Sequence, residues 1–426
     1  MKVKKLQQSQ FAVLMRKKPH LGFLLEGKSA SIIGSSLYNL ALLTLASQQK
    51  DPALAISLVS LLGYLPDIID PFTAYLSDRE EKHLKKGIQL SFVQALIYLV
   101  TAIFLLDSQL PFALFIVVVL ANVSSDILDN YIIALQNPLI KRWVASDELR
   151  LFSSASTIIR QICSILGKLL GVFWLMLYPQ KFATLSVLNA MTFLLCAYFL
   201  KRIKVDGTLK STEQAEKISL KDFGTKMQRA YHQIKTTKLL NNLIMMALVN
   251  FILASFSLLR KVALDADQNL HFGSYSQTLF TLELCFFIGL LTGAFLRPKW
   301  LEALSYAELL VIMIGIITVS VIDCLFYGPL WVVLLAQIAF ASVMGYLVPK
   351  FSAEMIEMVP EEELARVASL TNFVLLFAPP LGSLQATLLL YFFSLKLAWI
   401  VELVLLISGM LLLGYFVLQK RKEDLA

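Results

Sequence analysis

Charge is the scarcest property of this sequence. Only 16% of its 426 residues are Asp, Glu, Lys or Arg, whereas a soluble domain has about 25%. Hydrophobic residues make up 57% of the chain, above the roughly 45–50% of soluble proteins. This composition excludes a soluble enzyme, a disordered protein and a nucleic-acid binder. The net charge of +8 fits a membrane protein, because such proteins concentrate Lys and Arg in their cytoplasmic loops.

Motifs for catalysis and nucleotide binding are missing. No G-x-x-x-x-G-K-[ST] segment is present, so we expect no nucleotide-driven pump on this chain alone. The four histidines lie in predicted loops or at span edges, and the four cysteines lie in or beside apolar runs without metal-ligand spacing. We therefore expect neither an enzyme nor a metal site, and no bound cofactor.

Long apolar runs dominate what is present. A bilayer-spanning helix needs about 20 apolar residues, and within lipid each run must be helical to pair its own backbone amides. The sequence predicts an all-α polytopic membrane protein with spans near 21–47, 53–76, 87–107, 110–137, 152–177, 183–200, 240–259, 274–296, 306–325, 329–348, 368–391 and 397–418.

The basic residues predict the orientation of these spans. With the N-terminus in the cytoplasm, 30 of the 38 Lys and Arg residues fall in cytoplasmic segments. The opposite loops receive Lys50, Lys181, Arg260, Lys261 and Lys396. This bias predicts a multi-pass plasma-membrane protein with both termini cytoplasmic.

The longest polar stretch divides the chain into halves. We expect a cytoplasmic segment at 1–20, a six-helix bundle at 21–200, a cytoplasmic linker at 201–239, a second bundle at 240–418 and a cytoplasmic tail at 419–426. The sequences of the linker and the N-terminal segment are each compatible with an amphipathic helix on the membrane surface or with a solvated segment without regular structure.

The two halves also echo each other in sequence. A-S-D-E-L-R precedes the fifth span and P-E-E-E-L-A-R the eleventh, so that Leu149 and Leu364 stand 215 residues apart. Parallel six-helix repeats across a linker are the plan of one large class of transporters.

Several short motifs support that plan. They are Ser60–Pro66 followed by Pro71–Arg79, a degenerate copy at Gly289–Gly293, Met344–Tyr346, Pro379–Gly382, and the linker segment Ile218–Leu240. On these segments the sequence resembles the major facilitator superfamily, and within it the macrolide-efflux-like drug exporters. The resemblance implies the twelve-helix fold with two pseudo-symmetric halves. Ala74 departs from the loop signature, and Gly167–Gly171 lacks the proline of the antiporter signature.

The resemblance also implies a conformational gate at Asp78 and Arg79, whose partner would lie near Ser369–Thr371 at the start of the eleventh span. The alternative is that Arg79 and the lysines behind it only anchor the second span at the membrane surface.

Ionisable residues inside spans are costly and mark functional sites by default. The candidates for proton coupling are Asp67, Asp70, Asp126, Asp129, Arg160 and Glu283. Equal depth in neighbouring spans predicts that Arg160 pairs with Asp129 or Asp70, which leaves Asp67 and Asp126 to exchange protons. The alternative is that these groups form static ion pairs between helices.

These observations favour a secondary active transporter that exports hydrophobic or amphiphilic small molecules by alternating access, with the proton gradient as its energy source. An uptake symporter, or an exporter of a lipid, siderophore or peptide, is the alternative. A non-transporting membrane enzyme or receptor is the third hypothesis. We expect a monomer whose partners are a small-molecule substrate and the lipid bilayer. No residue is assigned to substrate binding.

The topology can be tested with introduced cysteines. Cysteines at Ser211 and Gln419 should resist a membrane-impermeant thiol reagent in intact cells, and one at Gln268 should react, because the basic-residue bias places the first two in the cytoplasm. Labelling at Ser211 from outside would overturn the whole orientation.

Overall fold

The fold consists of long helices. The computed structural model describes residues 11, 13–107, 110–204, 239–267, 270–296, 304–326, 328–358 and 361–425. Within these ranges twelve helices are long and apolar enough to cross a membrane, which confirms the predicted all-α class and number of spans. The predicted linker helix lies outside the described residues.

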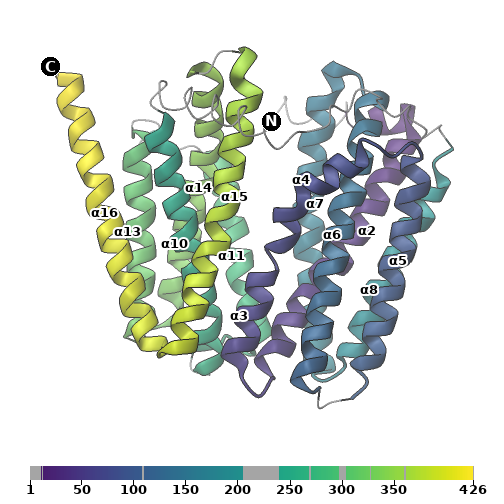
Figure 1. Cartoon of the computed structure of the whole chain (residues 1–426), viewed down its shortest axis with the longest axis horizontal. Coiled ribbons are helices and arrows are strands. Elements are labelled where there is room, and N and C mark those ends of the chain that lie inside the picture. Colours follow the sequence, from purple (N-terminus) through teal and green to yellow (C-terminus); the bar gives the residue numbers. More distant parts are fainter. Residues whose placement is uncertain are drawn as a thin grey trace. The chain divides into compact units, whose positions relative to one another are not determined.

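The helices form two compact units, Met1–Lys50 with Leu65–Glu216, and Asp51–Tyr64 with Lys217–Ala426. Unit 1 contains α2 (Pro19–Ser47), α4 (Leu65–Ser77), α5 (His83–Phe104), α6 (Phe112–Trp143), α7 (Ser146–Leu177) and α8 (Phe182–Arg202). Within it α2 packs against α7 and α8, α5 against α6 and α8, and α4 against α6 (Figure 1).

The described end of the N-terminal segment belongs to the core of unit 1. Leu14 is 2% exposed and clusters with Leu21, Trp143 and Phe152. Lys18 forms a 2.8 Å ion pair with Glu148 near the start of α7. These contacts tie the chain before α2 to the connection between α6 and α7.

Unit 2 contains α3 (Pro52–Leu62), α10 (Leu239–Ala266), α11 (Tyr275–Leu296), α13 (Tyr306–Leu325), α14 (Leu330–Met358), α15 (Glu361–Phe392) and α16 (Leu395–Leu425). Its main packing pairs are α11 with α14, α10 with α15, and α13 with α16 (Figure 1).

The second predicted span, 53–76, is two helices. Asp51 caps α3 by accepting a 3.1 Å hydrogen bond from the Leu54 N–H, and α4 begins at Leu65 with Pro66 in its first turn, where a proline needs no N–H. The α3 helix packs on α10 and α15, and Lys261 Nζ donates a 3.4 Å hydrogen bond to Ser60. Residues 51–64 thus group with the C-terminal helices, whereas the sequence analysis placed them in the bundle 21–200.

Glycines bring helix backbones together at equivalent places in the two units. A Cβ at Gly167 on α7 would overlap the carbonyl oxygen of Ile33 on α2, and a Cβ at Gly382 on α15 would overlap that of Phe251 on α10. The two glycines stand 215 residues apart, the spacing of the predicted repeat. Small residues permit such close approach in membrane bundles, so the repeat in sequence is also a repeat in packing.

The same role explains Gly171 and the degenerate motif copy. Gly171 faces Leu37 on α2, whereas Gly289 and Gly293 on α11 face Ile338 and Ser342 on α14. In each case the nearest atom is a backbone carbonyl oxygen of the neighbouring helix, which cannot move as a side chain can. Helix packing therefore accounts for these glycines without an antiporter signature.

Replacement of Gly167 should test the packing. Gly167→Ala places a methyl group against the Ile33 carbonyl and should lower the free energy of unfolding by about 1–3 kcal/mol, the usual cost of overpacking. Gly22→Ala on α2 is the control, because nothing lies within 4 Å of its Cβ. Thermal unfolding in detergent measures both, and equal melting temperatures would contradict the assignment.

Candidate functional site

Polar and ionisable side chains of four helices come near one another in unit 1, where those of Asp67 and Arg160 are exposed. Lys28 and Ser31 lie three residues apart on α2 and therefore share a helix face, as Asp126 and Asp129 do on α6. Asp67 comes from α4 and Arg160 from α7. The glycine contacts between α7 and α2 bring the helices that carry Arg160 and Lys28 together. We call these six residues the unit 1 cluster.

Asp129 lies at the centre of the unit 1 cluster. Its Oδ1 accepts a 2.9 Å hydrogen bond from Ser31, and its charge interacts with those of Lys28 and Arg160. The sequence analysis predicted that Arg160 pairs with Asp129 or Asp70. Within the described residues, however, neither cation forms an ion pair with Asp129 shorter than 4 Å.

Lys28 is the residue that sequence reasoning left out of the site. In the structure it is half-buried and interacts electrostatically with both Asp129 and Arg160. Its position nine residues after Pro19, about 13 Å along α2, was the signal that could have found it.

Asp126 ends a chain of hydrogen bonds. The Tyr98 hydroxyl on α5 donates to Asn122 Oδ1 at 2.9 Å, and Asn122 Nδ2 donates to Asp126 Oδ2 at 3.0 Å. Tyr98 and Asn122 are buried, so the carboxyl group is held from one side. Asp126 also interacts with the charges of Asp129 and Asp67. Repulsion among three carboxylates can be relieved by nearby cations or by binding a proton.

The two acids of α4 have different partners. Asp67 interacts with Asn130 and Asp126 on α6, which joins it to the unit 1 cluster. Asp70 accepts a 3.3 Å hydrogen bond from Thr73 on its own helix, and its side chain is exposed. No ion pair shorter than 4 Å joins Asp70 to Arg160 in the described part of the chain.

Asp78 and Arg79 directly follow the end of α4, and both side chains are exposed. The Arg79 guanidinium lies over the ring of Tyr75, 4.2 Å from its centroid. Ser369, in the predicted partner segment, is outside the residues whose side chains are described. The gate role of Asp78 and Arg79 stays a prediction.

Unit 2 has a polar group of its own. Arg260 Nη1 on α10 donates a 2.7 Å hydrogen bond to Gln337 Oε1 on α14, and Glu283 on α11 interacts with the Arg260 charge. The prediction that Arg260 and Lys261 lie in a loop was wrong, because α10 continues to Ala266. The apolar run stops at the two cations, but the helix continues through Val262, Ala263 and Leu264.

A third buried contact joins α10 to α16. Glu402 is fully buried, and its Oε2 accepts a 2.6 Å hydrogen bond from Ser255. Its Oε1 has no partner among the described residues. This contact links two helices of unit 2 through a carboxyl group.

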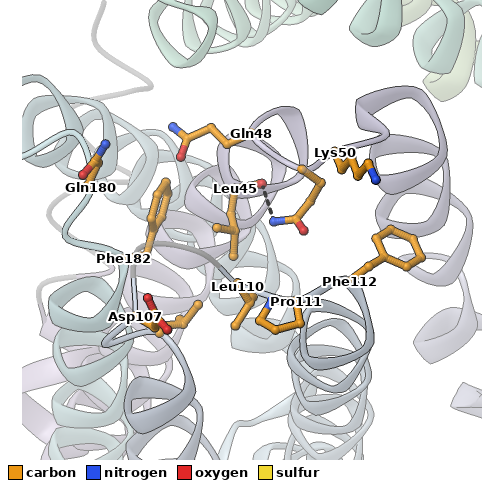
Figure 2. A pocket seen from close by; sticks show the side chains of 11 residues that line it. Leu45, Gln48, Lys50, Asp107, Leu110, Pro111, Phe112, Gln180 and Phe182 are labelled. Carbon is orange, nitrogen blue, oxygen red and sulfur yellow. Dashed lines mark hydrogen bonds between the residues drawn. The ribbon is translucent and has the colours of Figure 1, made fainter.

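A pocket of about 500 Å³ lies at the end of unit 1 where α2 stops. Figure 2 shows apolar side chains such as Leu110 and Phe182 beside the polar Gln48, Gln180 and Asp107. Its lining is Leu45, Gln48, Gln49, Lys50, Leu105, Asp107, Leu110, Pro111, Phe112, Gln180 and Phe182. None of the unit 1 cluster lines it, so the pocket and the cluster are separate features.

Comparisons with known proteins identify the fold. No protein-family model and no curated protein matches the chain. A POT family transporter in complex with 5-aminolevulinic acid matches over 93% of this chain and 95% of that one, with a TM-score of 0.67 and 14% identity.

Two other transporters give the same result. The nucleoside transporter NupG matches over 92% of this chain and 99% of its own, with a TM-score of 0.67 and 13% identity. A bacterial homolog to the human lysosomal transporter Spinster, inward-facing and occupied, matches over 94% and 97%, with a TM-score of 0.64 and 11% identity. The chain therefore has the major facilitator fold, and this likeness does not single out the macrolide-efflux group.

The partnership of Lys28 with Asp129 can be measured by a double-mutant cycle. Lys28→Met and Asp129→Asn should each destabilise the protein, and the double variant should be more stable than the sum of the two losses predicts, by about 0.5–3 kcal/mol. The physical reason is that each single change removes a nearby opposite charge from the other residue. Chemical unfolding in mild detergent gives the four free energies.

Lys181→Met is the matched control, because Lys181 is exposed and directly precedes α8. Its effect should simply add to that of Asp129→Asn. An additive result for Lys28→Met as well would show that the two residues do not interact.

Proposed function

We propose that this chain is a secondary active transporter that moves hydrophobic or amphiphilic small molecules across the plasma membrane, coupled to protons, by alternating access. Twelve candidate spans in the major facilitator fold support a transporter, since the solved structures with this fold named above are transporters. Export is the preferred direction, on the resemblance in sequence. Uptake, or export of a lipid, siderophore or peptide, remains compatible with the same fold.

The observation that carries the proton coupling is the unit 1 cluster. Asp126 interacts with the charges of Asp129 and Asp67, and Asp129 interacts with those of Lys28 and Arg160, within a bundle that lipid surrounds. Lipid offers such groups no partners, and acidic chains at this depth are characteristic of proton relays. Repulsion between neighbouring carboxylates favours binding of a proton to one of them, so such a group can bind and release a proton.

In this proposal the proton acts through helix contacts. While Asp129 is ionised, it attracts Lys28 on α2 and Arg160 on α7. A proton on Asp129 removes that attraction, which changes the relative stability of conformations that differ in the positions of these helices. Asp126, fixed by Asn122 and Tyr98, is placed to exchange the proton with Asp129. Asp78 and Arg79 would then set the balance between the two conformations.

The test uses purified protein in proteoliposomes with an imposed pH gradient. A panel of cationic, zwitterionic, anionic and neutral amphiphiles should include substrates that collapse the gradient. Asp126→Asn and Asp129→Asn should abolish this proton movement, because an amide cannot carry the proton. Exchange of substrate at equal concentration on both sides should continue within about tenfold of normal, or about 1.4 kcal/mol.

Glu26→Gln is the control, since Glu26 is an exposed acid on α2 that the unit 1 cluster does not include. It should leave the proton movement intact. Proton movement that survives the double change Asp126→Asn with Asp129→Asn would refute the coupling site, and a panel without any transported compound would refute the function.

A further inference from the structure

Three polar residues of unit 2 lie at one depth. Arg260 stands six residues before the end of α10, Gln337 seven residues after the start of α14, and Glu283 eight after the start of α11. The C-terminal end of α10 and the N-terminal ends of α11 and α14 lie at the same end of the bundle, because successive spans run in opposite directions. At 1.5 Å per residue the three residues are about 9–12 Å from it. We call them the arginine layer.

The Arg260 guanidinium is held by two contacts and keeps unused donors. Nη1 donates to Gln337, and the guanidinium lies over the ring of Phe256 on the preceding turn, 5.1 Å from its centroid. Nε is buried without a hydrogen-bond partner among the described residues. A fixed guanidinium with free N–H groups matches the two oxygens of a carboxylate or phosphate. An arginine at such a depth is costly unless it has a use.

An aromatic layer lies one turn further into the bundle. Phe286 follows Glu283 by three residues on α11, and Phe340 follows Gln337 by three on α14, so each shares a helix face with its partner in the arginine layer. The two rings are stacked, with centroids 6.5 Å apart. Phe340 is buried and supports Phe286, which is partly exposed. A polar group at one level and an aromatic side chain at the next suit a molecule with a charged head and an apolar tail.

We propose that Arg260 recognises the negatively charged head group of an amphiphilic cargo, a single-chain carboxylate or phosphate, whose tail lies along Phe286. This inference rests on the proposed transport function, because it names the class of cargo. Gln337 is a positioning residue that orients the guanidinium, and Phe256 supports it from the preceding turn of α10.

Glu283 gives the proposal a directional test. Its negative charge interacts with Arg260 and therefore competes with an anionic ligand for the same cation. Removal of the arginine should weaken anion binding, whereas removal of the neighbouring negative charge should strengthen it. General damage to the bundle cannot produce two effects of opposite sign.

The experiment measures equilibrium binding of dodecanoate and of dodecanol to the full-length protein in nanodiscs of neutral lipid. Arg260→Gln should weaken dodecanoate binding by at least about tenfold, and Glu283→Gln should strengthen it. Gln337→Ala should weaken it less than Arg260→Gln does. Dodecanol binding should stay the same in all three variants, and thermal unfolding shows that each is folded.

The remaining outcomes are also decisive. Equal losses of dodecanoate and dodecanol in Arg260→Gln, or no gain in Glu283→Gln, would overturn the proposal. In nanodiscs that contain an anionic phospholipid, dodecanoate should still bind, and its complete displacement would show a lipid-binding site instead of a cargo site. If dodecanoate does not bind but neutral or cationic amphiphiles still collapse the pH gradient, the proposed transport function stands and this class of cargo is refuted.

Discussion

Charge inside a bilayer must find its partners within the protein, and this constraint organises both units. In unit 1, Asp129 on α6 attracts Lys28 of α2 and Arg160 of α7, so one carboxylate links three helices. In unit 2, Arg260 of α10 reaches Gln337 on α14 and interacts with Glu283 of α11. These contacts place polar groups between helices, where a ligand or a proton can alter them.

Such contacts are possible because glycines let the helices approach closely. Gly167 sets α7 against the backbone of α2, and Gly289 sets α11 against that of α14. A larger residue at either position would separate the helices whose side chains must meet. The packing glycines and the polar groups therefore depend on each other, because close packing of the helix backbones brings the charged side chains near one another.

Much of this could be predicted from the sequence, but the partners of the charges could not. The spans follow from long apolar runs, and the acids inside them stand out because lipid makes them costly. The break between α3 and α4 was missed because hydropathy continues through Gly63 and Pro66. Arg260 was missed because an apolar-run rule ends a span at the first pair of cations. Lys28 was not among the candidate residues, because its depth depends on where α2 begins.

The internal repeat preserves packing glycines but not charged residues. Packing glycines recur at the offset of 215 residues, as Gly167 and Gly382 do, but the charges do not recur. The same offset carries Asp126 and Asp129 to Ala341 and Met344, and it carries Glu283 back to Ile68. Both halves build six-helix bundles without repeating these charges, so the charges are particular to each unit. This difference matches the two tasks proposed, proton exchange at the unit 1 cluster and recognition of the cargo head group at the arginine layer.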